Sequence, residues 1–277
     1  MTRVLLSVRS IMAMVRLIIL DGLRRHALIG LILFALAGTT GGLLFFDFIP
    51  RDIGRATNDF LFSVIWLTGF IFLLFHAVQV MAWDNERGAL HTFLARPISR
   101  TQYGLALFAG LAALLLVLNI ILGSLSWFLL NVVKGSVEEF YFQHLSFVNF
   151  VLSAAGLYWI QLAILAIILF FSSAVRGSFP VLLLTICYYL ICFGLPVVRS
   201  SFMQRANNED SVFLLGILKG LTALFPDFSR LDFKNLVTTN GQLPTALDLT
   251  VPFASLTLYI IIVLWLACSI YKRRDLQ

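Results

Sequence analysis

The residues that decide the fold class are 60–83, FLFSVIWLTGFIFLLFHAVQVMAW, a stretch without a charged side chain between Asp59 and Asp84. A helix crosses the hydrocarbon core of a bilayer with about 20 mostly apolar residues. The stretch therefore predicts a membrane-spanning helix rather than an element of a soluble core.

The rest of the chain has the same character. Of its 277 residues, 60% are apolar and 12% are charged, whereas ordinary soluble domains have roughly 45–50% apolar and about 25% charged residues. The mean hydropathy is +0.95. Because so little polar surface cannot cover a core of this size, a single soluble globule is excluded. The sequence predicts an all-α membrane protein whose transmembrane domain, 27–271, has six spans: 27–46, 60–83, 104–130, 147–171, 178–198 and 251–271.

The fourth and fifth spans are separated by a single charge, Arg176. An arginine in the middle of a membrane costs roughly 2.5–3.5 kcal/mol on insertion scales. Residues 172–178 are therefore expected to form a tight turn at the surface.

The positive charges are distributed unevenly between the connections of these spans. The chain has 20 Lys and Arg residues and a net charge of +6, and most of those in short connections fall on the side of the N-terminus. Since cytoplasmic loops are enriched in Lys and Arg, we expect both termini, including the tail 272–277, to be cytoplasmic. The pattern indicates a multi-pass protein of the cytoplasmic (inner) membrane and accounts for the basic charge without a nucleic-acid partner.

Residues 1–26 do not form a span, because arginines recur through them. On a helical wheel the charged residues occupy about half of the circumference and apolar residues the other half, which predicts an amphipathic helix at the membrane interface. Two compatible roles are open: a membrane anchor, or an elbow helix beside the cytoplasmic domain of a partner. Residues 24–37 also imitate a signal peptide with its cleavage site, but the apolar run continues to Phe46, long enough to span.

The connection after the second span, 84–100, has the pattern of a short helix on the cytoplasmic side. Asp84 can cap its start, and Glu86 is favourable in its first turn. Apolar side chains, among them Phe93, then fall on one face. Pro97 ends the helix at or before the preceding arginine.

The third span restarts directly after this helix. Ser99 and Gln102 have capping-box spacing, and Ile98 and Tyr103 have the spacing of a hydrophobic staple. The predicted helix is thus tied at both ends to the second and third spans, as a mechanical coupling element requires. The plainer interpretation, an ordinary helical loop lying on the membrane, stays open at this point.

The long connection 199–248 is expected on the extracytoplasmic side. Its apolar run 212–225 would rise about 21 Å as a helix, which is too short to span. The run either dips into the membrane and returns or packs on the outer ends of the spans. Ser229-Arg230-Leu231-Asp232 predicts a cap for another short helix.

Motifs for catalysis and nucleotide binding are missing from the sequence. It contains no G-x-x-x-x-G-K-[ST] loop and no H-E-x-x-H or G-x-S-x-G motif, and its histidines and cysteines lack metal-ligand spacing. Among polar residues inside the spans, Asn119 and Gln161 are interpreted as interhelical hydrogen bonders. We expect neither enzymatic activity nor a cofactor or metal in this chain, so active transport would need energy from another chain.

The stretch from Glu86-Arg87-Gly88 to Leu94-Ala95-Arg96-Pro97-Ile98-Ser99-Arg100 resembles the permease subunits of ABC transporters of the type-2 exporter class. Residues 20–25, LDGLRR, are similar to the entry into the first span of that family, and residues 224–232 to the segment before its sixth. Leu107 departs from the pattern, because many members have a lysine shortly after the turn. The resemblance covers nearly the whole chain.

This resemblance implies a separate ABC ATPase, in two copies that bind ATP and Mg²⁺, and either a second permease copy or a related permease. It implies that 84–96 is the coupling helix seated in a groove of the ATPase and that the outward loop is the extracytoplasmic gate. The expected ATPase-coupling residues are Asp84, Glu86, Arg87, Leu90, Phe93, Leu94 and Arg96. The expected helix-restart turn consists of Pro97, Ser99, Arg100 and Gln102.

The leading hypothesis is thus export across the membrane, coupled to ATP hydrolysis by the partner, along a substrate path that the residues do not identify. An alternative is a membrane scaffold through which an ATPase acts on the assembly of an envelope protein, without solute transport. A third interpretation, an intramembrane enzyme, lacks any nucleophile, base or metal cluster.

Overall fold

The computed structural model describes residues 2–24, 27–43, 53–81, 99–136, 145–205, 220, 225–237 and 246–273, and every regular element in these ranges is helical. In chain order the elements are α1 (Thr2–Arg24), α2 (Ala27–Leu43), α3 (Ile53–Ile71), η2 (Phe72–Ala77), α6 (Arg100–Ser136), α7 (Phe147–Ala174), α8 (Ser178–Arg205), η4 (Phe228–Leu231), η5 (Lys234–Val237) and α10 (Ala246–Arg273).

Five helical stretches of the described residues are long and apolar enough to cross a membrane: Ile53–Met81, Thr101–Ser136, Phe147–Ala174, Ser178–Val198 and Leu247–Lys272. This content is compatible with a multi-pass membrane protein. The described part of the predicted first span is α2, a shorter apolar helix, and residues 44–46 of that span lie outside the described residues. Five of the six predicted spans therefore correspond to a helix that is long enough to cross a membrane. The total of six spans stays a prediction.

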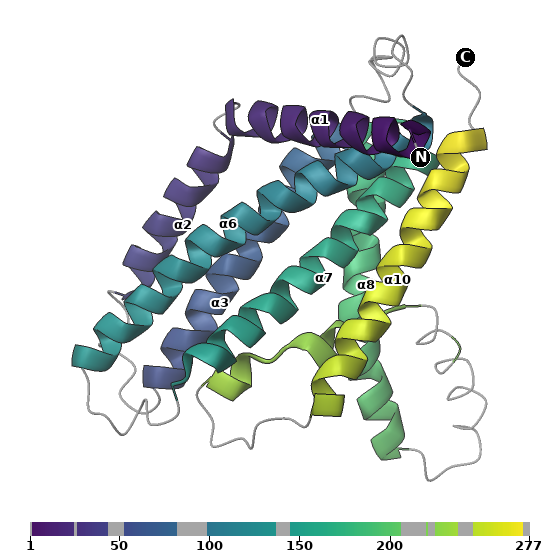
Figure 1. Ribbon diagram of the computed structural model, residues 1–277. Coiled ribbons are helices and arrows are strands. Elements are labelled where there is room, and N and C mark those ends of the chain that lie inside the picture. The colour runs from purple at the N-terminus through teal and green to yellow at the C-terminus, as the bar shows by residue number, and fades with distance from the viewer. Residues whose placement is uncertain are drawn as a thin grey trace.

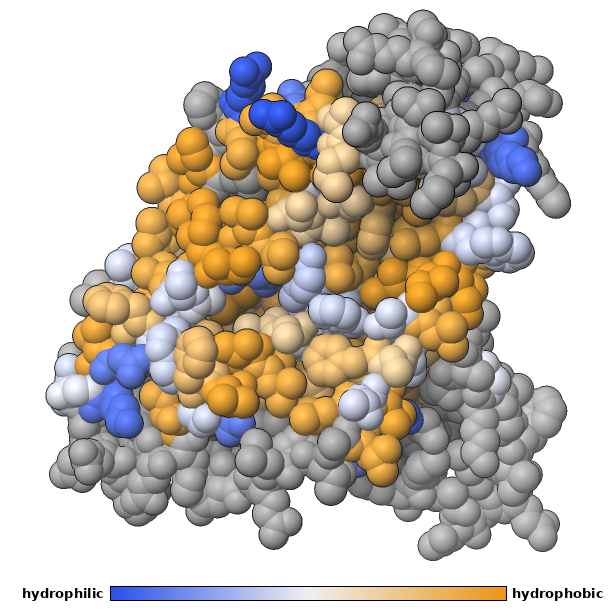
Figure 2. Space-filling model, in the orientation of Figure 1, coloured by the Kyte–Doolittle hydropathy of each residue, from blue (hydrophilic) through white to orange (hydrophobic). Residues whose placement is uncertain are grey.

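Successive long helices run in opposite directions (Figure 1). α2, α6 and α8 begin at the end of the bundle where Thr2 and Arg273 lie, and α3, α7 and α10 return to it. We call this the terminal end, and the opposite one, which carries residues 225–237, the loop end. Figure 2 shows that hydrophobic residues cover most of the middle of one face, whereas the strongly hydrophilic described residues lie mainly near its two ends.

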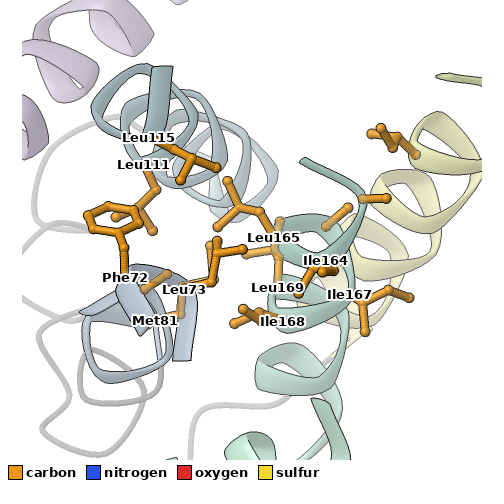
Figure 3. Packing of buried hydrophobic residues seen from close by; sticks show 14 of the residues in the cluster. Phe72, Leu73, Met81, Leu111, Leu115, Ile164, Leu165, Ile167, Ile168 and Leu169 are labelled. Atoms are coloured by element: carbon orange, nitrogen blue, oxygen red, sulfur yellow. The ribbon is translucent and has the colours of Figure 1, made fainter. Parts of the chain in front are cut away.

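The core lies where η2, α6 and α7 meet. Phe72 and Leu73 of η2, Leu111 and Leu115 of α6 and Leu165 of α7 are all fully buried, and Figure 3 shows their side chains converging from the three helices. α10 packs along α7, where the indole N–H of Trp159 donates to Thr257 Oγ1 at 2.9 Å. Because lipid is as apolar as these side chains, close packing and interhelical hydrogen bonds hold the bundle together.

The second predicted span differs from a regular helix. Its middle, Phe72–Ala77, is a π-helix in which the backbone N–H of Val78 donates to the carbonyl of Leu73, five residues earlier. Such segments are rare and interrupt α-helices mostly as single turns, often at functional sites. Hydropathy carries no signal for this change of hydrogen-bond register.

Several helices extend beyond the predicted spans. α3 begins at Ile53, seven residues ahead of the prediction, and its first turns carry an i,i+4 ion pair of Arg55 and Asp59 at 4.0 Å. α6 and α8 likewise continue past their predicted ends. The span predictions counted apolar residues, whereas backbone hydrogen bonding carries a helix on into polar sequence.

The turn between α7 and α8 is shorter than the seven residues, 172–178, that the sequence predicts for it. Ser172 and Ser173 belong to α7 and are buried, and Ser172 Oγ donates to the carbonyl of Met81 at 3.0 Å. The turn itself consists of residues 175–177, with Gly177 at φ 106°. Glycine suits this position because L-residues rarely adopt positive φ.

α1 lies across the terminal end of the bundle and packs along the first half of α6 (Figure 1). A Cβ on Gly110 of α6 would lie 2.8 Å from Ile18, and a Cβ on Gly22 would lie 2.5 Å from Leu114. Part of the apolar face predicted for 1–26 thus covers α6 rather than lipid. The interfacial position and the elbow role of α1 stay predictions.

Candidate functional site

The predicted ATPase-coupling residues Asp84, Glu86, Arg87, Leu90, Phe93, Leu94 and Arg96, together with Pro97, lie outside the described residues. Their helix and their contacts stay predictions. The helical stretch Ile53–Met81 that precedes them ends at the terminal end of the bundle, and α6, which follows them, begins there.

The start of α6 is fixed by its own side chains. The backbone N–H of Ser99 donates to Gln102 Oε1 at 3.0 Å, and the backbone N–H of Gln102 donates to Ser99 Oγ at 3.3 Å. These are the two reciprocal bonds of a capping box, as the spacing of the two residues predicts. The helix therefore begins at Arg100, the remaining described residue of the predicted helix-restart turn.

The first turns of α6 are also held by neighbouring helices. Tyr103 is 5% exposed, and a Cβ on Gly104 would be in ordinary contact with the ring of Tyr271 in α10, at 3.5 Å. Two turns further on, α6 meets α1 at Gly110. A displacement of the start of α6 would consequently be passed to α1 and α10.

A partly buried polar pair joins α6 and α7 in the middle of the bundle. Asn119 Nδ2 donates to Gln161 Oε1 at 2.7 Å and to the carbonyl of Leu115 at 2.9 Å. The prediction that these amides bond between helices is confirmed. Gln161 is fully buried, and its Nε2 has no hydrogen-bond partner among the described residues.

At the loop end, residues 225–237 form a compact segment over the beginnings of α3, α7 and α10 and beside the middle of α8; we call it the cap segment. Two side chains bind its backbone: Asn58 Nδ2 of α3 donates to the carbonyl of Lys234 at 3.0 Å, and Ser153 Oγ of α7 donates to the carbonyl of Phe233 at 2.8 Å. A Cβ on Gly156 would lie 2.5 Å from the carbonyl oxygen of Leu231, so the segment rests directly on α7.

The cap segment also has an internal scaffold. Asp227 accepts from the backbone N–H of Ser229 at 3.1 Å and from its Oγ at 2.6 Å, and it pairs with Arg230 at 3.3 Å. Asp227 therefore caps the 3-10 helix η4. A short helix is present near the stretch 229–232 that the sequence predicts as a cap, but it begins at Phe228 and its N-cap is Asp227 rather than a residue of that stretch. A second ion pair joins Asp232 and Lys234 at 3.3 Å.

Two cavities flank α8 beneath the cap segment. The larger, about 310 Å³, lies between α3, α7, α8 and the cap segment, and its lining includes Trp66, Leu157 and Tyr189. The smaller, about 230 Å³, lies between α8, α10 and the cap segment. Cys192 and Pro196 of α8 and Leu231 of the cap segment line both cavities, so α8 and Leu231 separate the two spaces there.

Sequence reasoning missed the clamp of Asn58 and Ser153 on the cap segment. Asn58 lies next to Asp59, at the polar start of an apolar run, and Ser153 is a single serine in a largely apolar stretch of α7. Neither position distinguishes these residues from ordinary polar residues of a membrane helix. Their partners are backbone carbonyls, which leave no mark in the sequence. Asn58 and the preceding Thr57 are completely buried, but this burial is visible in the structure and not in the sequence.

The described residues contain no group of three or more His, Cys, Asp or Glu side chains placed to hold a metal ion. Neither comparison by sequence identifies a relative: no family model matches the chain, and no curated protein matches it.

Proposed function

We propose that this chain is a permease subunit of an ABC transporter of the type-2 exporter class, which moves a substrate across the membrane with energy from a separate ATPase. The observation that carries the proposal is the capped start of α6. Ser99 and Gln102 fix the direction in which α6 leaves the connection 82–98, so a push on that connection acts on a whole helix.

α6 is suited to transmit such a push. It has 37 residues, or about 55 Å of helix, and runs from the terminal end to the loop end in contact with α1, α3, α7 and α10. On the other side of the connection, α3 is continued by the π-helical turn η2, Phe72–Ala77, at the core. Movement of both helices would change the packing under the cap segment, where an exit path must open.

The partners follow from the same arrangement. Two ATPase copies, with ATP and Mg²⁺, would bind at the terminal end through the predicted coupling residues 84–96. A second permease or lipid would cover the apolar faces of α8 and α10, on which Phe193 is 63% and Trp265 is 68% exposed. The excess of positive charge at the terminal end supports a cytoplasmic position for that end.

The decisive experiment is purification of the tagged full chain from membranes of its own host. We expect an ATPase with a phosphate-binding G-x-x-x-x-G-K-[ST] loop to co-purify, and Phe93→Asp or Leu94→Asp to reduce its recovery at least tenfold without loss of membrane insertion. Ser201→Asp is the matched control, because it places an acidic side chain on an exposed site at the loop end. Full recovery of the ATPase with both variants contradicts the proposed docking site.

Sidedness is tested with single cysteines in a chain whose Cys187, Cys192 and Cys268 are replaced by serine. A membrane-impermeant maleimide added to intact cells should label Ser229→Cys at the loop end. It should label Lys272→Cys only after the membrane is made permeable. The opposite labelling pattern would overturn the orientation.

A further inference from the structure

The cavity between α3, α7 and α8 has an apolar body and a polar mouth. Its lining includes Trp66, Leu157, Ile160 and Tyr189 of the helices, whereas the cap segment contributes the polar and at least partly exposed side chains of Ser229, Asp232 and Lys234. The rings of Trp66 and Tyr189 lie 5.7 Å apart and give one wall a continuous aromatic surface. This division matches a molecule with an apolar tail and a polar head.

The size of the cavity limits what it can hold. Its volume of about 310 Å³ is at the lower end of the range of small-molecule sites. Along α8 its lining runs from Tyr189 to Val197, a helical rise of about 12 Å. This space suits part of one acyl chain and is too small for a polysaccharide or a folded protein segment.

The cavity is accessible from the surface of the chain. Ser63 of α3 and Phe193 and Val197 of α8 line it and are exposed. The exposed lining of α8 is apolar, so a tail could enter from the hydrocarbon layer without crossing water. A water-soluble ligand would have to leave water to enter by this apolar side, which is unfavourable.

The charges at the mouth indicate the head group. Asp232 and Lys234 lie 3.3 Å apart and their side chains are 46% and 40% exposed, so one acid and one base are available side by side. A head group with one positive and one negative charge can place its negative group at Lys234 and its positive group at Asp232. A head group with a single charge would pair with one of these side chains and be repelled by the other, which has the same sign.

We infer that this cavity binds a zwitterionic amphiphile, with its tail against Trp66, Leu157 and Tyr189, its phosphate at Lys234 and its ammonium at Asp232. Taken as the cargo site, it names the substrate class of the exporter and rests on the proposed function. The binding itself is a property of this chain alone. Phospholipid and single-chain lysolipid share this chemistry, and the test separates them.

The test uses native mass spectrometry of the delipidated full chain in detergent, with phosphatidylethanolamine, lysophosphatidylethanolamine and phosphatidylglycerol as probes. One ethanolamine lipid per chain should bind more tightly than phosphatidylglycerol. Tighter binding of the lyso form would identify a single-chain ligand, and tighter binding of the two-chain form a membrane phospholipid.

Blocking variants locate the site. Leu157→Phe fills the body of the cavity and Ser63→Trp obstructs its rim from an exposed position; both should weaken binding at least fivefold. Val148→Phe is the matched control, since it enlarges a residue of α7 that is 68% exposed and outside the cavity. Ser63→Trp also covers the case in which Leu157→Phe fails to fold.

Charge variants test the head group. Asp232→Asn leaves Lys234 without its acid and should shift the preference toward phosphatidylglycerol, by about two- to fivefold for so exposed a pair. Lys234→Gln should weaken the binding of all three probes. Arg230→Gln, in the same segment but lining the other cavity, should change nothing.

Equal binding of all probes, or equal effects of Leu157→Phe, Ser63→Trp and Val148→Phe, would overturn the inference. Because the assay contains no ATPase, its result is independent of the ATPase co-purification. Specific lipid binding without a co-purifying ATPase would refute the proposed function and leave the site standing. The reverse result would refute the site alone.

Discussion

Gly69 of α3 and Gln161 of α7 touch so closely that they set the separation of their helices. A Cβ on residue 69 would lie 2.2 Å from Gln161 Nε2 and 2.7 Å from its Cδ. Gln161 cannot simply swing away, because it is fully buried and accepts the hydrogen bond of Asn119. The contact lies just before the π-helical turn of the same helix, Phe72–Ala77.

Gly69→Ala should therefore destabilise the bundle by about 1–3 kcal/mol, the usual cost of overpacking a closed interface. Unfolding in mixed detergent micelles measures it. Gly38→Ala on α2 is the control, because nothing lies within 4 Å of the position that its added methyl group would occupy. Equal stability of the two variants would show that α3 and α7 can separate freely at this point.

The Asn119–Gln161 bond should show a positive coupling energy in a double-mutant cycle. In membrane bundles such bonds contribute about 0.6 kcal/mol on average and up to about 1.7 kcal/mol. Asn119→Leu, Gln161→Leu and the double variant are compared by the same unfolding assay. Asn131→Leu is the control, since among the described residues Asn131 bonds to the Trp127 carbonyl of its own helix, at 2.8 Å, and to no other helix. Strict additivity would mean that the bond contributes nothing to stability.

The turn between α7 and α8 depends on Gly177. At φ 106° an alanine is strained, and left-handed conformations cost L-residues roughly 1–2 kcal/mol. Gly177→Ala should lower stability by about that amount, with Gly177→Asn milder because Asn tolerates positive φ better. Gly123→Ala, in open space on α6, should instead leave stability unchanged or raise it, because alanine is the better helix former. A neutral Gly177→Ala would contradict the turn geometry.

Hydropathy and spacing predicted those features that a local pattern determines. The long helices follow from apolar runs, and the capping box of Ser99 and Gln102 from a three-residue spacing. That Asn119 and Gln161 bond between helices follows from the cost of an isolated amide in an apolar span, although their pairing with each other is known from the structure alone. Each of these needs only the residue and its near neighbours in sequence, or the general rule that buried amides find a partner.

The features that escaped prediction depend on distant contacts. Asn58 binds a carbonyl 176 residues away and Ser153 one 80 residues away, and backbone acceptors are the same in every sequence. The two cavities arise from the way α8 stands off from α3 and α10, which no single helix encodes. The π-helical turn likewise reflects a choice of hydrogen-bond register that the apolar side chains of residues 72–77 leave open.

Loss of the capping box should loosen the start of α6 specifically. Ser99→Ala should cost about 1 kcal/mol, which corresponds to about fivefold faster hydrogen exchange at the first-turn amides. Ser136→Ala is the control, because Ser136 lies at the opposite end of α6 and its Oγ bonds the Val132 carbonyl. If the exporter proposal holds, Ser99→Ala should also reduce transport per ATP hydrolysed. Unchanged exchange at residues 101–103 would show that the box does not hold the helix start.

Release of the cap segment should expose Cys192. This thiol is 1% exposed and lines both cavities under the segment. Asn58→Ala combined with Ser153→Ala removes both side chains that hold the backbone of residues 233 and 234. In detergent, N-ethylmaleimide should then label Cys192 several-fold faster than in the unaltered chain, because local opening governs access to buried groups.

Cys187 provides the internal reference for this measurement, since it lies on the same helix and is exposed. Its labelling rate should stay the same in both chains, so a general loss of structure, which would leave the two cysteines equally reactive, is recognised at once. Ser255→Ala is a further control: it removes a residue of the smaller cavity whose hydroxyl bonds, among the described residues, to the Pro252 carbonyl of its own helix. Unchanged labelling of Cys192 after loss of both clamps would mean that the contacts of Leu231 and Val237, both buried, suffice to close the loop end. Opening there would then have to begin with movement of α3 or α7 themselves.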